Sequence, residues 1–169
     1  MYRVGQFISY GNSGVCEVVG TREMETEQPG TGSRKCYILR PIHDKTCTIT
    51  TPVDNHKVIM RELISPEETR QLLADIPEIK TMPDQSARQQ ELAYQKALHS
   101  GDCKQWICLV KTLDCRIRSR KARGKKVTAT DDRYFKAATE KLTEEFSVVL
   151  GISSDQMKEL LQDAFTDSV

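Results

Sequence analysis

The stretch Ser65-Pro66-Glu67-Glu68 separates two parts of the sequence that differ in character. A serine before a proline is typical of a helix start, because the hydroxyl caps the first turn and proline tolerates the first helical position. Glu68 follows Ser65 at the spacing of a capping box. The segments before this stretch are strand-like and those after it are helix-like, so we predict two domains, 1–65 and 66–169.

The first domain is predicted to contain four or five short strands. The strand at 7–10 ends at Gly11-Asn12-Ser13-Gly14, a strong turn sequence. Further segments typical of strands lie at 15–21, 35–40 and 46–51, a polar loop lies at 23–34, and the segment 58–64 is a short final strand or a turn. A small sheet that closes on itself has no exposed edge. We therefore predict a small antiparallel β-barrel.

The second domain is predicted to contain five short helices. The first ends near Pro77, the second covers 84–99, and the last three begin at the caps Asp102, Thr128 and Ser153. Their apolar residues recur at helical spacing, which predicts a compact bundle and an α+β fold class for the whole chain. The predicted buried stripes of the last three helices are Trp106, Leu109, Val110, Leu113 and Ile117; Phe135, Ala138, Leu142, Phe146 and Val149; and Met157, Leu160, Leu161 and Phe165.

The composition is that of a soluble globular protein, with 38% hydrophobic and 29% charged residues. No apolar run approaches the roughly 18 residues that a membrane span needs. The start, Met-Tyr-Arg-Val-Gly-Gln, lacks the layout of a signal peptide. We therefore expect a cytoplasmic protein that does not bind membranes.

Neither the cysteines nor the histidines form a pattern of metal or catalytic chemistry. The six cysteines include no CxxC pair, so we expect reduced thiols, no metal and no cofactor. Cys108 and Cys115 are seven residues apart and are predicted to share a packed helix face. P-loop, GxGxxG and HExxH motifs are absent from the sequence, as is a recognisable triad pattern. We expect no enzymatic activity and no small-molecule substrate.

The net charge of +1 hides an uneven charge distribution. Residues 111–126 contain eight basic residues and one acid, Asp114, whereas residues 127–169 contain nine acids and four bases. The net charge by itself predicts no nucleic-acid partner, so the distribution is the more informative property. A solvated helix end is one interpretation of the run, because cations are favourable beside the helix dipole, but eight bases against one acid exceed what capping requires.

Several segments recur in the order found in a known family. They are Val4–Val15, Thr50-Thr51-Pro52-Val53-Asp54-Asn55, Leu98-His99-Ser100-Gly101-Asp102, Val110-Lys111-Thr112-Leu113, Thr128–Phe135 and Glu144-Glu145-Phe146. Together they resemble the CarD/CdnL transcription regulators over nearly the full chain. The resemblance implies the same division into a strand domain and a helical domain.

For the first domain, the resemblance implies a Tudor-like or SH3-like barrel. Such a barrel docks on the β subunit of RNA polymerase by pairing a strand edge with it, and the matching edge is 46–51. For the two arginines in the candidate set, a solvated barrel surface is the alternative interpretation. The candidate polymerase-binding residues are Arg22, Arg40, Thr48, Ile49, Thr50, Thr51 and Pro52.

For the second domain, the resemblance implies contact with double-stranded promoter DNA and stabilisation of the open promoter complex, without sequence-specific readout. Family members commonly carry a wedge tryptophan just before the second helix, but residues 77–100 contain none. Trp106 belongs to a predicted buried stripe, so Met82 is the nearest apolar wedge candidate. The candidate DNA-binding residues are Met82, Arg116, Arg118, Arg120, Lys121, Arg123, Lys125, Lys126 and Arg133.

Two other functions fit the sequence. One is a protein–protein adaptor with a peptide-binding barrel and a scaffolding bundle, which the modest net charge favours. The other is an RNA-binding protein, but Tyr10 and Tyr37 lie in predicted strands and leave few exposed aromatics for base stacking. We expect the protein to be a monomer.

Overall fold

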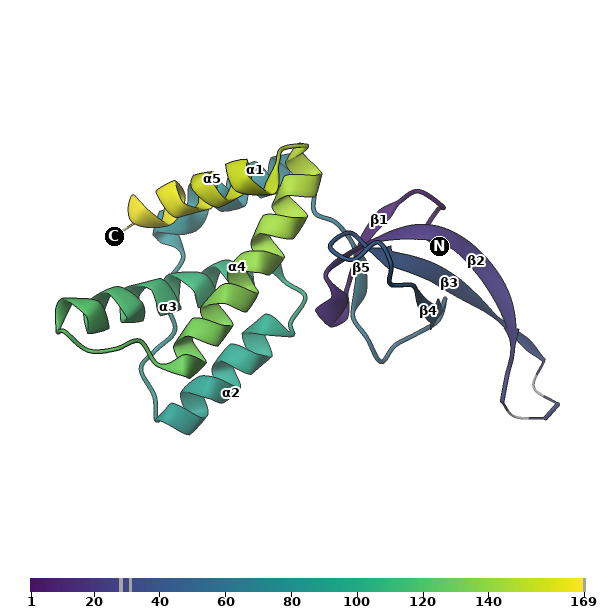
Figure 1. The fold of residues 1–169 in the computed structure, drawn as a ribbon, viewed down its shortest axis with the longest axis horizontal. Coiled ribbons are helices and arrows are strands. Elements are labelled where there is room, and N and C mark those ends of the chain that lie inside the picture. Colours follow the sequence, from purple (N-terminus) through teal and green to yellow (C-terminus); the bar gives the residue numbers. More distant parts are fainter. Residues whose placement is uncertain (28, 31, 169) are drawn as a thin grey trace. The chain divides into compact units, whose positions relative to one another are not determined.

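The computed structural model describes residues 1–27, 29, 30 and 32–168. The chain divides into two compact units, Met1–Leu63 and Ile64–Val169, here called the sheet unit and the helical unit (Figure 1). Among the described residues, no helix has the length and apolar character that crossing a membrane requires.

The sheet unit is an open antiparallel sheet with the strand order β4-β3-β2-β1-β5. The strands are β1 (Phe7–Tyr10), β2 (Val15–Glu25), β3 (Ser33–Pro41), β4 (Ile49–Pro52) and β5 (Met60–Glu62), and a 3-10 turn, η1 (Gly11–Ser13), joins the first two. The predicted barrel closure is wrong, because β4 and β5 are the two edges of the described sheet. Both edge strands are short, and β4 contains Pro52, a residue that a sheet tolerates at its edge.

Two predicted segment boundaries in the sheet unit are also wrong. The hairpin of β2 and β3 continues to the pair Glu25 and Ser33, and therefore both ends of the predicted loop at 23–34 belong to strands. Residues 28 and 31 of that loop lie outside the described residues. The predicted strand at 46–51 begins only at Ile49. Thr46 instead forms a turn, in which its N–H and hydroxyl donate to Asp44 Oδ1 at 3.0 and 2.6 Å. These hydrogen bonds lower the pKa of the Asp44 carboxyl.

One face of the sheet carries the core of this unit. Its fully buried residues are Ile8, Cys16, Val18, Tyr37 and Leu39, with Ile49 and Val53 packed against them. Tyr37 is buried and Tyr10 half-buried, so neither ring presents an open stacking surface.

The described part of the helical unit, 64–168, contains five α-helices and one short 3-10 helix. They are α1 (Pro66–Asp75), η2 (Ile76–Glu78), α2 (Ala87–Leu98), α3 (Cys103–Ala122), α4 (Ala129–Leu150) and α5 (Ser154–Thr166). The capping box that opens α1 is confirmed: Glu68 N–H donates to Ser65 Oγ, and Ser65 N–H donates to a Glu68 carboxylate oxygen. The predicted start of the second helix at 84 is wrong, because Ser86 caps α2 by accepting from Gln89 N–H.

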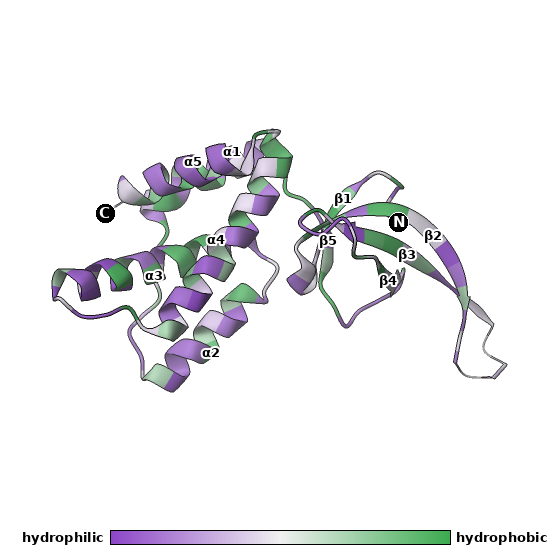
Figure 2. Ribbon diagram, viewed as in Figure 1, coloured by the Kyte–Doolittle hydropathy of each residue, from purple (hydrophilic) through white to green (hydrophobic). Residues whose placement is uncertain are grey.

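The helices pack through one apolar face each, as the alternating colours along them in Figure 2 indicate. Trp106 is buried and its Nε1–H donates to the Leu98 carbonyl at 3.1 Å, so its predicted core position is confirmed. Leu160 was predicted to be buried but lies exposed on α5, whereas Met157 and Leu161 face the core.

All six cysteines are free thiols, and they differ in exposure. Burial raises the pKa of the half-buried Cys108, whose Sγ lies 3.2 Å from the Lys80 carbonyl oxygen. Cys115 is exposed, so its predicted packing beside Cys108 is wrong. The physical reason is that α3, which is described throughout, has no buried residue after Leu113.

Candidate functional site

Strand β4 presents an open main-chain edge. Val53 N–H donates to the Lys35 carbonyl at 3.0 Å, and Thr51 stands opposite Tyr37 in the same register. Because antiparallel partners exchange hydrogen bonds at every second residue, Thr51 bonds to β3 and Thr50 directs its N–H and C=O away from β3. This edge can therefore accept another strand through its main chain.

Several predicted polymerase-binding residues share the face of the sheet opposite its core, here called the outer face. In the strand register, Arg22 of β2 stands opposite Cys36 of β3, and Cys36 stands opposite Pro52 of β4. Residues that stand opposite one another point to the same side of a sheet. Alternate residues of one strand share a face, so Arg40 of β3 and Thr50 of β4 also lie on the outer face. In contrast, Ile49 and Thr51 point toward the core, and Thr48 precedes the strand.

A shallow hollow of about 740 Å³ lies beside this edge. Met24, Cys36 and Pro52 supply its apolar surface, and Met24 is 43% exposed. Arg34 borders the hollow and forms an ion pair with Asp54 at 2.9 Å. A strand paired with β4 would place alternate side chains over this surface.

In the helical unit, the first member of the basic run does not reach the surface. Lys111 is 8% exposed, and its Nζ donates to the carbonyls of Ile76, Pro77 and Ile79 at 2.8 Å each. These carbonyls lie in η2 and at its C-cap, directly after α1, where helical hydrogen bonds run out. Lys111 therefore holds this turn against α3 rather than contributing to a phosphate-binding surface.

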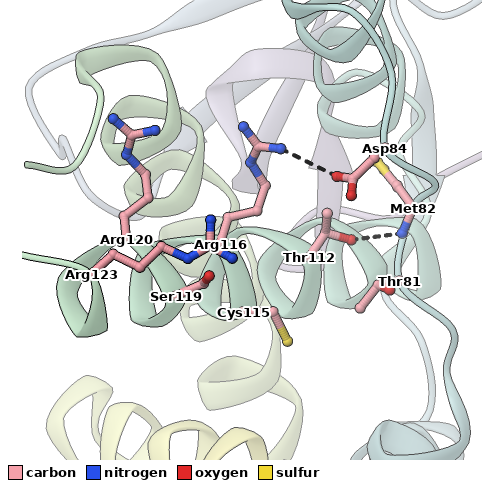
Figure 3. A pocket seen from close by; sticks show the side chains of 9 residues that line it. All are labelled: Thr81, Met82, Asp84, Thr112, Cys115, Arg116, Ser119, Arg120 and Arg123. Atoms are coloured by element: carbon pink, nitrogen blue, oxygen red, sulfur yellow. Dashed lines mark hydrogen bonds and ion pairs between the residues drawn. The ribbon is translucent and has the colours of Figure 1, made fainter. Parts of the chain in front are cut away.

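Three arginines of the run line one hollow of about 400 Å³ (Figure 3). Arg116 and Arg120 on one side of α3 and Arg123 at its C-cap form one wall, and the connector at 81–84 forms the opposite wall. Arg116 lies 3.5 Å from Asp84 and 3.4 Å from the buried Asp131. The other lining residues are Thr81, Met82, Asp84, Thr112, Cys115 and Ser119. We call this feature the arginine hollow.

The exposed end of the run adds unpaired cations near the arginine hollow. Lys121, Arg123, Lys125 and Lys126 are exposed, and none forms an ion pair with a described residue. Arg120 Nε donates to the Lys126 carbonyl at 2.9 Å, which ties the loop to the end of α3.

Two predicted DNA-binding arginines lie elsewhere. Arg118 is two residues from Arg116, about 200° around the helix, and it pairs with Asp114 at 2.9 Å. Arg133 pairs with Glu91 at 3.0 Å and stands over the Tyr134 ring. Neither lines the arginine hollow.

Met82 forms part of the hollow's wall. It is half-buried against the helical core, and its N–H donates to Thr112 Oγ1 at 2.9 Å. The structure thus brings the wedge candidate together with the arginines. Sequence reasoning missed Thr112, Cys115 and Ser119, although they share the three- and four-residue spacing of the lining arginines.

Residues 2–64 match the family model described as CarD-like/TRCF RID domain. The sheet unit is therefore a domain of this family, which confirms the resemblance for this part of the chain. The family consists of interaction domains rather than catalytic domains, and the match supports an RNA polymerase-interacting, transcription-related role for the sheet unit. A search among curated proteins found no match to the sequence.

Proposed function

We propose that this protein is a transcription regulator that docks on the β subunit of RNA polymerase and stabilises the open promoter complex. The sheet unit binds polymerase through the β4 edge, and the helical unit binds double-stranded promoter DNA. The match of residues 2–64 to an RNA polymerase-interacting domain carries this proposal. The open edge at Thr50 supports it, because strand addition needs unpaired main-chain groups.

The arginine hollow supports DNA binding by the helical unit. Guanidinium groups bind phosphate oxygens through paired, charge-assisted hydrogen bonds. The cations of Arg120 and Arg123 have no carboxylate partner among the described residues, so a phosphate does not have to displace one. Contacts of this kind fix the protein on DNA without reading base sequence.

Met82→Ala should shorten the lifetime of the open complex about fivefold, the effect of losing about 1 kcal/mol of apolar contact. Met82 forms the apolar part of a wall otherwise lined by polar groups, where it could contact an unstacked base step. The measurement is the decay of competitor-resistant open complexes. Met82→Leu retains an apolar side chain, so its open-complex lifetime should stay close to that of wild type. Equal lifetimes for wild type and Met82→Ala would show that Met82 does not contact the DNA.

Bound DNA should protect Cys115 from alkylation. Cys115 is an exposed thiol in the arginine hollow, whereas Cys47 is half-buried in the sheet unit and serves as the internal reference. Iodoacetamide labelling followed by mass spectrometry measures both rates with and without duplex DNA. We expect slower labelling of Cys115 alone. An unchanged Cys115 rate at saturating DNA would place the DNA away from this hollow.

A protein–protein adaptor is the second candidate. The observation that favours it is that Arg116, Arg118 and Arg133 already form ion pairs within the unit. The experiment that separates the two functions is a titration of labelled full-length chain with RNA polymerase and, separately, with duplex DNA. The regulator binds both, with salt-sensitive DNA affinity; the adaptor binds polymerase and shows no affinity for DNA.

A further inference from the structure

A second hollow of about 310 Å³ lies between α3, α4 and α5, away from the surfaces described above. Each helix contributes residues spaced three or four apart, so one stripe of each helix faces the hollow. The apolar walls are formed by Val110, Phe135, Leu161 and Phe165. The volume lies at the lower end of the range for small-molecule cavities, about 300 Å³.

Two cations stand at the polar rim of this hollow. Arg118 is held in place by Asp114 at 2.9 Å and donates to Thr166 Oγ1 at 3.4 Å. Lys158 is exposed and forms no ion pair with a described residue. With two cations and one carboxylate, the rim carries an excess positive charge. An anionic group is the complementary ligand chemistry.

One hydroxyl of the lining lies buried. The Thr139 hydroxyl is buried, and among the described residues it forms no hydrogen bond. A buried, unpaired hydroxyl costs free energy, and such groups are rare in folded proteins. A ligand oxygen in the hollow would accept its hydrogen.

We infer that this hollow binds a small amphipathic carboxylic acid. The apolar body of the acid lies against Val110, Leu161 and Phe165. The carboxylate of the acid pairs with Lys158 and with Arg118. The ion pair with Asp114 holds the Arg118 guanidinium in position for this contact. An oxygen on the body of the acid accepts from Thr139.

The test is a titration of the full chain with 3-hydroxyoctanoate, followed by amide chemical shifts, with the corresponding amide as the uncharged match. We expect saturable shifts confined to residues around the hollow, and affinity for the amide lower by about tenfold, the loss of one charge-assisted contact. Lys158→Gln should cause a similar loss. Lys136→Gln is the control, because Lys136 lies on α4, pairs with Asp132 and does not line the hollow.

Thr139→Val provides a second, independent readout. It replaces the unpaired hydroxyl by a methyl group of similar size, so the free protein should unfold at the same or a higher temperature while its affinity for the acid falls. A lower unfolding temperature would show that the hydroxyl has a partner in the free protein. The proposal is overturned if the acid does not bind saturably, if the amide binds equally well, or if neither Lys158→Gln nor Thr139→Val weakens binding.

Discussion

Thr50→Pro should weaken binding of the full chain to RNA polymerase by about 10- to 100-fold, a loss of about 1–3 kcal/mol. The substitution removes the outward N–H in the middle of the β4 edge and leaves an acceptor on the added strand unpaired. The sheet should stay folded, because Pro52 already occupies the next outward position of the same strand. Titration of labelled protein with polymerase measures the affinity, and thermal unfolding checks the fold.

Thr50→Val is the matched control for this prediction. It changes the exposed side chain and keeps the main-chain donor, so polymerase affinity should stay within about twofold of wild type. If Thr50→Val and Thr50→Pro weakened binding equally, the side chain would be the contact and strand addition at β4 would be wrong.

The sheet unit shows how far the sequence could predict pairing. Turn residues and β-branched runs located four strands and left the segment at 58–64, which contains β5, as a strand or turn; both signals are local. Closure of the sheet depends on whether β4 meets β5, and neither strand carries a residue pattern that specifies such a long-range pair. The outer face, in contrast, follows from period-two alternation once the register is known.

Replacing both Arg120 and Arg123 with glutamine should lower DNA affinity about tenfold or more at low salt. It should also reduce the slope of log affinity against log salt by about 1.8, at about 0.9 for each lost phosphate contact. Both arginines line the arginine hollow and have no carboxylate partner among the described residues. Fluorescence anisotropy with duplexes of two unrelated sequences measures both quantities, and the loss should be equal for the two sequences.

Arg118→Gln is the matched control for the double variant. It removes the same kind of charge from the same helix, but Arg118 lies on another side of α3 and is paired with Asp114. We expect a smaller loss of affinity and a nearly unchanged salt slope. A slope reduced as much as in the double variant would show that DNA contacts follow the whole basic run rather than the arginine hollow.

The helical unit shows the same limit of local prediction. The caps at Ser65, Thr128 and Ser153 were predicted correctly, because capping needs only residues within one turn. Lys111 was counted with the surface cations, although it follows Ile107 by four residues and so lies on the buried stripe. Its acceptors belong to another segment, and their position could not be read from α3 alone. The rotation of about 100° per residue in an α-helix predicts that Arg118 lies on a different side of α3 from Arg116 and Arg120, and this could have been seen in the sequence.

The lifetime of competitor-resistant open complexes, measured with purified RNA polymerase and the full chain, tests the central proposal most directly. We predict that wild-type protein, at a concentration near its dissociation constant for polymerase, lengthens this lifetime, and that Thr50→Pro at the same concentration loses most of the effect. The double glutamine variant at Arg120 and Arg123 should still bind polymerase but lose most of the effect. An unchanged lifetime while wild-type protein is bound to polymerase, or an undiminished effect of Thr50→Pro, would contradict the proposal.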